Sequence, residues 1–494
     1  MNAEDQYEIV VGLEVHAQLL TKSKLFCGDS TEFGSEPNTQ ISSIALGYPG
    51  TLPKMNKKAI EFAIKMGLAC ECKIEKHNYF ARKHYFYPDL PKGFQVSQHL
   101  TPICTKGIIK IKTSEGEKRI RLNRIHLEED AGKSIHDADH ESTSVDYNRA
   151  GVPLIEIVSE PDIRSSDEAY AYVSELRKLV RYLGICDGNM EEGSFRCDAN
   201  VSVRKKGDKQ LGTKVEVKNL NSIKHIKKAI DYEAARLMKL LQNKQPIFQQ
   251  TRSFDAATGT TFSIREKEDA DDYRYFAEPD LTPFDLDENF IEQVRNSIPV
   301  LQEERIKNYK KEYHLSEYDA SILTEEKSFS DYFEEVIHHI EIRGSQQEIL
   351  KSKYKAAANW MLGPVKSWLN ENNKDISGFA VQPQKIASII ELIDEGKLNF
   401  STASSRLWNI LLNHPDKEPG QIVIDENMGQ QSDITSIEEV IDHVLSKHTA
   451  KVTEYKKGKK GLLGLFVGEV MKLSKGKADP KITNDLLIEK LKSK

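Results

Sequence analysis

Residues Ser194–Arg204 read S-F-R-C-D-A-N-V-S-V-R, and this stretch decides how the first half of the chain folds. Apolar and polar residues alternate throughout it, and a two-residue period is that of a β-strand. One face of the predicted strand carries Phe195, Cys197, Ala199, Val201 and Val203. The other face carries Arg196, Asp198, Asn200, Ser202 and Arg204. Such a row of polar groups is typical of the floor of a site for a charged ligand, although a solvated outer face gives the same pattern.

Four other segments, 12–19, 119–134, 153–162 and 214–218, also place charged groups on one face of a predicted strand. Their polar residues are Glu14, His16, Gln18, His126, Glu128, Glu156, Lys214, Glu216 and Lys218. In the second segment the apolar parity switches, which predicts a β-bulge near Asn123. If the five segments pair in one sheet, their polar faces form a continuous basin with an excess of carboxylates.

A carboxylate-rich basin that also holds arginine, lysine and histidine suits a divalent cation that carries a nucleotide. Mg²⁺ prefers oxygen ligands and usually combines one or two protein carboxylates with phosphate oxygens. A single glutamate of this kind is more often part of a surface ion pair than a ligand. Glu156 differs, because leucine, isoleucine and valine flank it and an unpaired buried carboxylate is very costly. Glu156 therefore requires a metal ion, a cationic side chain or a proton.

The composition describes a highly charged chain with several domains. At 494 residues the chain is too long for one hydrophobic core, and it contains 38% apolar and 30% charged residues. No apolar run approaches the length of a membrane span and Met1–Ile9 is acidic, so we expect a cytoplasmic protein with no membrane association. The six cysteines include Cys70 and Cys72 but no second pair at zinc-finger spacing, which favours reduced thiols packed in the core.

Charge is unevenly distributed along the chain. The net charge is −6, yet residues 447–494 contain 13 lysines and no arginine against five acidic residues. A basic tail on an acidic body favours contact with nucleic acid, because phosphates attract lysine independently of base sequence. A lysine-rich, solvated helix surface explains the same composition, and both interpretations stay open.

The expected architecture is α+β at the beginning and helical afterwards. Residues 1–292 alternate strand-like segments with turns, and helices are expected at 166–183 and 222–242. Residues 293–424 are interpreted as an all-helical domain and residues 425–494 as a small, basic helical tail domain. No complete phosphate-binding loop or dinucleotide-binding glycine motif is present, and no amidase nucleophile is recognisable. The chain is therefore not expected to release ammonia from glutamine itself.

Long motifs throughout the chain match one family. In the first half they are V-G-L-E-V-H (11–16), Y-F-Y-P-D-L-P-K-G-F-Q-V-S-Q (85–98), H-L-E-E-D-A-G-K-S (126–134), N-R-A-G-V-P-L-I-E-I-V-S-E-P-D (148–162), E-E-G-S-F-R-C-D-A-N-V-S-V (191–203) and D-D-Y-R-Y-F-A-E-P-D-L (271–281). In the second half they are A-A-N-W-M (357–361), G-L-F-V-G-E-V-M-K (464–472) and G-K-A-D-P (476–480). Together they resemble the B subunits of tRNA-dependent Asp/Glu amidotransferases over nearly the whole chain.

The resemblance implies a fold and a reaction. The fold is an antiparallel-sheet catalytic cradle akin to glutamine synthetase and the guanido kinases. In the reaction, ATP phosphorylates the side-chain carboxylate of Glu-tRNA(Gln), Asp-tRNA(Asn) or both, and ammonia derived from glutamine displaces the phosphate. ATP is required because a carboxylate is a poor acyl donor, and Mg²⁺ with basic groups stabilises the charge of the transferred phosphoryl group. Which of the two tRNAs is the substrate stays open.

The resemblance also implies roles for individual residues. Catalysis is assigned to Glu14, His16, Glu128, Glu129 and Glu156. The expected Mg²⁺ ligands are Glu14, His16, Glu129 and Glu156. The residues expected to bind ATP or the substrate are Lys83, Tyr85, Arg196, Asp198, Asn200, Glu216 and Lys218. A tyrosine such as Tyr85 is equally well explained as an ordinary core residue.

The implied assembly is a heterotrimer. A separate amidase polypeptide, the A component, would supply ammonia, a small C component would wrap around the pair, and the tail domain would bind tRNA. Many relatives carry paired cysteines around positions 27, 29, 42 and 45, but only Cys27 is a cysteine here, so no zinc is expected. Two rival interpretations are a non-catalytic tRNA-binding scaffold and a free-standing ligase for a small carboxylate. The complete acidic set argues against the first, and the basic tail argues against the second.

Overall fold

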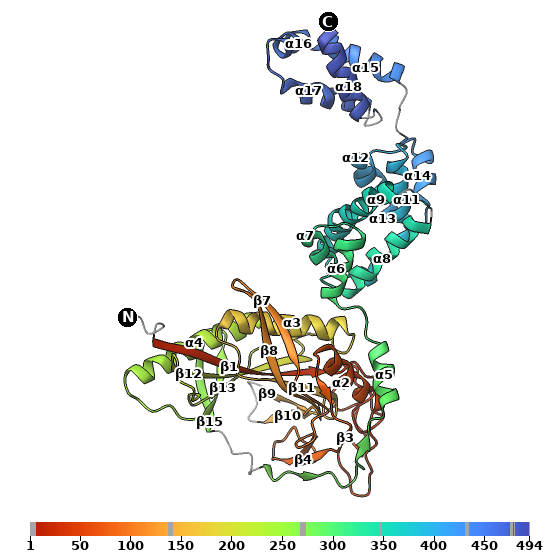
Figure 1. Cartoon of the computed structure of the whole chain (residues 1–494). Helices are drawn as coiled ribbons and strands as arrows, with labels where there is room; N and C mark the ends of the chain where they lie inside the picture. The colour runs from red at the N-terminus through yellow and green to blue at the C-terminus, as the bar shows by residue number, and fades with distance from the viewer. Residues whose placement is uncertain are drawn as a thin grey trace. The chain divides into compact units, whose positions relative to one another are not determined.

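A computed structural model of the chain describes residues 6–136, 142–266, 273–342, 344, 347–429, 434–474, 478 and 480–493 (Figure 1). The chain divides into two compact units, Met1–Pro299 and Val300–Lys494. The motifs at 271–281 and 476–480 lie partly outside the described residues. No helix in the described part combines the length and the apolar character that crossing a membrane requires.

The first unit is built on one large sheet, in which the strands follow the order β15-β14-β13-β12-β1-β11-β8-β5-β4-β16. The five strands with predicted polar faces are consecutive in this order, which confirms the prediction that they pair. They are β13 (Val215–Lys218), β12 (Phe195–Lys205), β1 (Tyr7–Gln18), β11 (Pro153–Ser159) and β8 (Gly116–Glu129). The others on this path are β15 (Thr260–Glu266), β14 (Gln250–Asp255), β5 (Phe94–Ser97), β4 (Ala81–His84) and β16 (Phe276–Ala277). Neighbours along the path are antiparallel except for β13 and β14, which are parallel.

Shorter strands complete the first unit. Two of them, β6 (Cys104–Thr105) and β7 (Ile108–Thr113), pair with β8. The third, β2 (Lys73–Ile74), pairs with β6. Two separate two-stranded sheets consist of β9 (Lys133–His136) with β10 (Thr143–Asp146), and of β3 (His77–Asn78) with β17 (Phe284–Asp285). A mixed α/β unit with a large sheet is therefore observed, as the sequence predicts.

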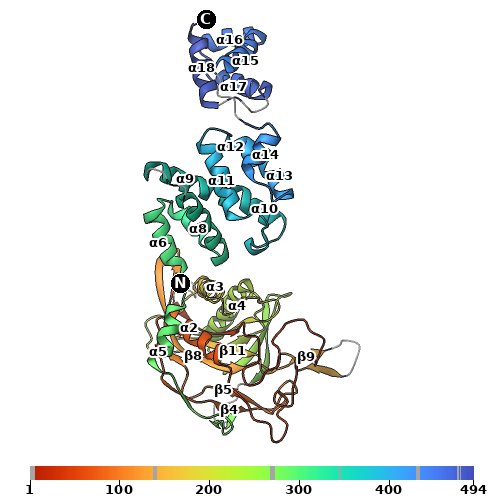
Figure 2. The same ribbon diagram turned by 90° about the vertical axis from the view of Figure 1, so that its right-hand side faces the viewer.

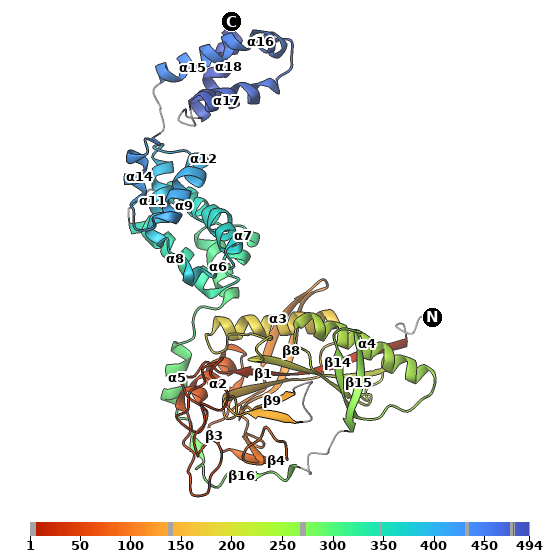
Figure 3. The same cartoon turned by 180° about the vertical axis from the view of Figure 1, so that it is seen from behind.

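Helices cover the apolar face of the sheet. Figures 1 and 3 show α3 (Ser166–Tyr182) and α4 (Ile223–Gln242) lying across the same face, from opposite viewpoints. The apolar residues of β1 and β12 on this face are fully buried, including Leu13, Val15, Ala199 and Val201. Ser222 accepts a hydrogen bond from His225 N and caps α4, as its position before the helix predicts. With one face packed against helices, the opposite face of the central strands is left for polar groups.

The predicted β-bulge is confirmed at Asn123. Val158 pairs with Arg124, but the next residue, Ser159, pairs with Leu122, so Asn123 is the extra residue in β8. The bulge switches which residues of β8 face the core. Because of this switch, Leu122 and Ile125 are both buried in the apolar core, and His126 pairs directly with Glu156.

Further helices of the first unit are α2 (Lys57–Ala69) and α5 (Glu288–Asn296). These two helices pack against each other. The first compact unit continues beyond α5 to Pro299, whereas the predicted division at residue 292 falls inside that helix. The three-domain division of the whole chain stays a prediction.

The second unit is helical (Figure 2), and its described residues form two separate hydrophobic cores. The first core joins α6 (Gln302–Glu312), α7 (Glu317–Leu323), α8 (Lys327–Ile342), α9 (Gln347–Trp360), α10 (Lys366–Glu371), α11 (Pro383–Asp394), α13 (Trp408–Asn413) and α14 (Pro419–Asp425). The short helix α12 (Phe400–Thr402) lies between α11 and α13 in the sequence. The second core joins α15 (Ile434–Lys447), α16 (Thr449–Lys456), α17 (Leu462–Leu473) and α18 (Pro480–Ser493). A π-helical turn, Met361–Val365, separates α9 from α10 and contains Pro364, which has no N–H to donate. A second π-helical turn, Ala403–Leu407, joins α12 to α13.

Candidate functional site

Charged side chains form a row across the centre of the sheet. Register pairs Arg196 of β12 with His16 of β1, and His16 with Glu156 of β11. Glu156 in turn pairs with His126 of β8. Side chains of directly paired residues project from the same face of a sheet, so these residues are immediate neighbours. The row therefore lies on the face opposite to the buried apolar side chains of β1 and β12.

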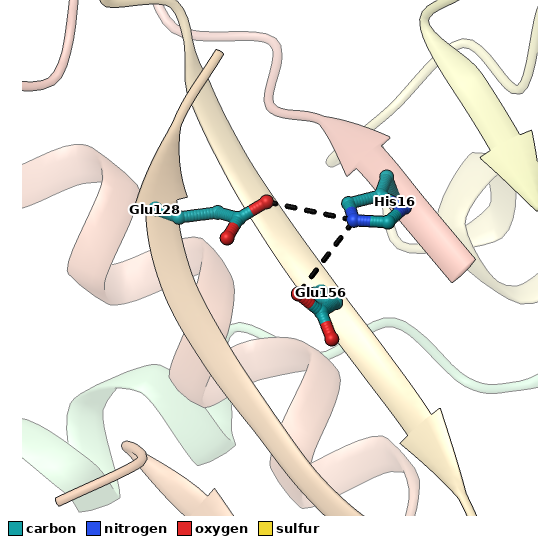
Figure 4. Close-up of side chains that lie close together, drawn as sticks. All are labelled: His16, Glu128 and Glu156. Carbon is teal, nitrogen blue, oxygen red and sulfur yellow. Dashed lines mark ion pairs between the residues drawn. The ribbon is translucent and has the colours of Figure 1, made fainter. Parts of the chain in front are cut away.

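Two carboxylates and one imidazole converge at the middle of the row. His16 Nε2 lies 3.6 Å from Glu128 Oε1 and 3.6 Å from Glu156 Oε2. Figure 4 shows the His16 ring facing both carboxylates, with each of the three side chains on a different strand. One ligand atom from each residue lies within 4.8 Å of the other two. Among the described residues, no other set of three or more His, Cys, Asp or Glu side chains is grouped in this way.

A second histidine, His126, contacts the same carboxylates. Its Nε2 atom lies 3.3 Å from Glu156 Oε2 and 3.4 Å from Glu128 Oε2. His126 was not among the site residues predicted from the sequence. The signal that could have identified it is its position on the same strand face as Glu128, two residues away, on the far side of the predicted bulge.

The pKa values of this cluster reflect a balance between burial and charge. Burial opposes protonation of His126, but the charge of Glu156 and hydrogen bonds to Glu128 and Glu156 raise its pKa to about 9. The pKa of His16 is also raised, because Glu156 and Glu128 outweigh the effect of burial. Burial alone would raise the pKa of Glu156, yet His126 and His16 hold it well below its usual range. Glu156 is thus kept ionised by the neighbouring histidines.

This donor set fits a divalent cation. Carboxylate oxygens are the ligands that Mg²⁺ prefers, and neutral imidazole is a common ligand for divalent metals. The carboxylates of Glu128 and Glu156 lie close enough together to favour a positive charge between them, and they raise the pKa of His16, which favours its protonated form there. A metal ion bound by the same three side chains would meet the same electrostatic demand.

A second polar group adjoins the row on β1, β12 and β13. Glu14 Oε1 accepts a hydrogen bond of 2.9 Å from Asn200 Nδ2, and Asp198 Oδ2 accepts one of 2.7 Å from Lys218 Nζ. Lys218 Nζ also lies 3.6 Å from Glu216 Oε1, and these two carboxylates raise the pKa of Lys218 although burial opposes it. The Oδ1 atom of Asn200 is buried and accepts no hydrogen bond within the described part of the chain. The structure therefore brings five predicted residues together, with an acceptor atom left for a ligand.

Arg196 is fixed by an aspartate that the sequence interpretation missed. Asp130 accepts hydrogen bonds from Arg196 at 3.0 Å and from the Gln18 amide at 2.8 Å. Burial would raise the pKa of Asp130, but Arg196, Arg149 and Gln18 lower it. The run Glu128-Glu129-Asp130 was the available signal, since its third acid directly follows two predicted site residues.

Glu129 lies apart from the group of His16, Glu128 and Glu156. Its two carboxylate oxygens accept hydrogen bonds of 2.6 and 2.7 Å from Lys92 Nζ, and one also accepts from Val96 N at 2.8 Å. It lines a cavity of about 260 Å³ together with Lys24, Arg82 and Lys92. The structure therefore groups neither Glu129 nor Glu14 with His16 and Glu156, the other two predicted metal ligands.

Lys83 lies against a group of aromatic residues that includes Tyr85. Lys83 Nζ lies 4.8 Å from the ring centre of Tyr273 and 5.6 Å from that of Tyr85. Burial would lower the pKa of Lys83, but Tyr275, Glu128 and Glu156 raise it. Burial raises the pKa of Tyr85, so its hydroxyl stays protonated. Lys83 is thus a cation close enough to interact electrostatically with the carboxylates of Glu128 and Glu156.

Comparison with known families accounts for both units. The family model described as the GatB/GatE catalytic domain matches residues 9–292, which include every residue of the charged row. A second model, described as the GatB domain, matches residues 345–491. The first match alone covers more than half of the chain. The chain belongs to the GatB family.

Curated relatives of this GatB chain are similar over their full length. A protein of Thermodesulfovibrio yellowstonii is 49% identical over 99% of the chain and 100% of the relative. Proteins of Geotalea daltonii and Chlorobium phaeobacteroides are 47% and 46% identical over 98% of the chain and 99% of each relative. All three are named as the B subunit of aspartyl/glutamyl-tRNA(Asn/Gln) amidotransferase. The predicted resemblance to that subunit is therefore confirmed.

In this GatB chain the cysteines make no disulfide among the described residues. Cys27 Sγ donates a hydrogen bond of 3.2 Å to Asp29, and the same carboxylate accepts one from Ser42 N. The thiol pKa of Cys27 is raised to about 11, mainly by burial. That no zinc is bound stays a prediction.

Proposed function

We propose that the cradle of this GatB chain activates and amidates the side-chain carboxylate of a misacylated tRNA. By family membership, the chain is one subunit of a glutamine-dependent, tRNA-dependent amidotransferase, an enzyme that forms a carbon–nitrogen bond. In the proposed reaction, a carboxylate oxygen of Glu-tRNA(Gln) or Asp-tRNA(Asn) attacks the γ-phosphorus of ATP, and ADP leaves. Ammonia then attacks the carbonyl carbon of the acyl phosphate, inorganic phosphate leaves, and the amide forms.

The observation that carries the proposal is the convergence of His16, Glu128 and Glu156 on three adjacent strands, with ligand atoms within 4.8 Å of one another. We assign these side chains to Mg²⁺. When bound, Mg²⁺ would neutralise charge on the phosphates during transfer. His126 would act as a positioning residue, because its contacts fix the orientation of both carboxylates. The contacts of Glu156 with His16 and His126 explain how a carboxylate is accommodated in an otherwise apolar strand.

The adjoining residues are proposed to bind ATP and the aminoacyl end. Arg196 and Lys218 supply fixed positive charge beside the metal set, and basic groups of this kind steady phosphate oxygens. The buried Oδ1 atom of Asn200 is available to accept a hydrogen bond from a ligand or to contact a cation. Asp198 and Glu216 hold Lys218 in place, while Lys83 and Tyr85 form the opposite border of the site.

For Glu14 the predicted metal-binding role is retained as a proposal, whereas for Glu129 we favour an orienting role over the metal-binding role predicted from the sequence. Each carboxylate is engaged in the structure, Glu14 by Asn200 and Glu129 by Lys92. Both oxygens of Glu129 accept hydrogen bonds, so Glu129 would have to exchange Lys92 in order to bind a cation, whereas Glu14 is engaged through Oε1. A catalytic role that orients the neighbouring side chain requires no such exchange.

The wider setting is also part of the proposal. We infer a cradle of the glutamine synthetase and guanido kinase type, followed by a helical domain and a tRNA-binding tail. The amidase, or A, component would deliver ammonia, and the small C component would complete a cytoplasmic heterotrimer. This division of labour is supported by the absence of a recognisable amidase nucleophile from the sequence.

Replacement of Glu156 by Gln tests the proposed function. In the complex with its partner subunits, E156Q should retain glutamine hydrolysis but lose ATP-dependent phosphorylation of the charged tRNA. The matched control is E117Q, at an exposed position of the neighbouring strand β8 that lies outside the site. Wild-type phosphorylation and amidation by E156Q would refute the catalytic role and favour a scaffold that only binds tRNA.

A further inference from the structure

A cavity in the second compact unit lies outside the cradle and has no part in the proposed phosphoryl transfer. It has a volume of about 140 Å³ and lies between α9, α11 and α12. Most of its wall is apolar and comes from Trp360, Ile390, Ile393 and Phe400. The polar groups that line it include Asn359 and Lys353. An apolar hollow with a few polar groups at its border is typical of a small ligand site.

The sequence motif A-A-N-W-M, residues 357–361, forms part of this cavity. Core packing explains four of its five residues, because Ala357, Ala358, Trp360 and Met361 are buried. Asn359 is exposed and its amide has no hydrogen-bond partner within the described part of the chain. The Asn359 amide is therefore not held by packing or by another side chain, and it is available to contact a ligand in the cavity.

The two aromatic residues that line the cavity, Trp360 and Phe400, both lie close to a π-helical turn. Trp360 directly precedes the π-helical turn Met361–Val365, and Phe400 begins the short helix that leads into the π-helical turn Ala403–Leu407. Such turns are rare and occur frequently at functional sites. The ring of Phe400 lies 5.6 Å from that of Trp360, yet 48% of Phe400 is exposed to solvent. A large aromatic surface is thus left open at the border of the cavity.

The charges at the cavity disfavour a phosphate group as its ligand. Lys353 Nζ lies 2.9 Å from Glu391 Oε1 and 3.4 Å from Asp394 Oδ2, so two carboxylates surround its positive charge. An uncharged planar ring suits the apolar walls better. The Asn359 amide offers both a donor and an acceptor, which is the combination that reads the edge of a nucleobase.

We propose that this cavity receives an unpaired base of the tRNA substrate. The base stacks on Phe400 while Asn359 hydrogen-bonds its edge, as proteins recognise unstacked bases in single-stranded parts of RNA. This inference rests on the proposed function only for the identity of the substrate. It assigns to the second unit a contact with a base, in addition to the attraction between the tail lysines and phosphates.

The test is the binding of in vitro-transcribed tRNA(Gln) and tRNA(Asn) by the full-length chain. F400A should weaken binding of at least one transcript about tenfold or more, the loss typical of one stacked base. The slope of log K against log salt should stay unchanged, because no phosphate contact is removed. N359A should also weaken binding, and F400Y should restore near wild-type affinity because tyrosine keeps the stacking surface. Y318A, at an aromatic residue that is 73% exposed on α7 of the same unit, is the matched control.

Wild-type affinity of both F400A and N359A for both transcripts would overturn the inference. It would also be overturned if these substitutions weakened assembly with a partner protein instead, since the cavity would then hold a protein side chain. The outcome is separate from that of the proposed function. F400A should raise the KM for charged tRNA without lowering kcat, whereas E156Q should lose phosphorylation while it still binds tRNA.

Discussion

His126 and Glu156 face each other directly across β8 and β11, and His126 Nε2 lies 3.3 Å from Glu156 Oε2. The same nitrogen also approaches Glu128, so one buried imidazole contacts both carboxylates of the proposed metal site. Contacts of this kind orient metal ligands and are themselves important for affinity. The relationship makes His126 the first residue to test outside the predicted set.

Replacement of His126 by Asn should weaken the dependence on Mg²⁺ without abolishing the site. The shorter side chain cannot contact both carboxylates, so the Mg²⁺ concentration for half-maximal amidation should rise about tenfold or more. A Mg²⁺ titration of amidation by the assembled enzyme measures this, with H77N at an exposed histidine of the cradle as control. An unchanged titration curve would show that His126 does not position the ligands.

Glu129 and Glu156 should differ in their effect on the Mg²⁺ requirement. Lys92 and Val96 N engage the Glu129 carboxylate, which lies outside the group formed by His16, Glu128 and Glu156. E129Q should therefore leave the Mg²⁺ concentration for half-maximal activity within about twofold of wild type, even if kcat falls. E156Q should abolish saturable Mg²⁺ dependence. A large shift in E129Q would instead support the role as metal ligand predicted from the sequence.

Much of the central sheet could be predicted because its signals are local. The alternation in Ser194–Arg204 required a strand with one polar face, and the change of parity at Asn123 required a bulge. Both are confirmed, and so is the pairing of the five polar strands in one sheet. The order of the strands could not be derived in this way, since the central strand β1 pairs with β11 and β12, which lie more than a hundred residues away in the sequence.

The prediction of the site from the sequence was limited for the same reason, because the site also depends on contacts between different strands. Glu156 was identifiable because a carboxylate in an apolar strand requires a partner, but the identity of that partner depends on strand register. Register decides that His16 and His126 lie on either side of Glu156. Glu129 is separated from Glu128 because consecutive residues of β8 point to opposite faces of the sheet. Asp130 was missed for a similar reason, because its contact with Arg196 joins residues from segments that do not pair.

Lysines of the tail should contribute to RNA binding through charge alone. Lys456, Lys457 and Lys460 are exposed at the end of α16 and in the turn that follows it. Their replacement by Gln removes three charges and leaves the buried core of the tail intact, whereas truncation after Ser446 would cut through that core. Affinity for tRNA should fall and the slope of log K against log salt should become shallower by up to about two units. Unchanged affinity and slope would show that these lysines contact solvent and do not bind RNA.

Asp319 should stabilise the helical unit in a pH-dependent way. Its carboxylate pairs with Lys355 of α9 and accepts a hydrogen bond of 2.8 Å from Ser316, the cap of α7. Burial would raise the pKa of Asp319, but Lys355 and Ser316 lower it from the usual 3.8. Because the pKa is lower in the folded state, the stabilisation is fully present above about pH 4 and is lost as the pH falls through the folded pKa.

D319N should therefore lower the free energy of unfolding by about 1 kcal/mol at neutral pH, and the difference from wild type should shrink below about pH 4. The three tryptophans, Trp360, Trp368 and Trp408, all lie in the second unit, so urea unfolding followed by tryptophan fluorescence reports on this unit selectively. D416N, at an exposed aspartate of the same unit, serves as the control and should behave like wild type throughout. A D319N difference that stayed constant as the pH fell would show that the carboxylate charge contributes nothing, because only an ionised Asp319 distinguishes wild type from the amide in this way.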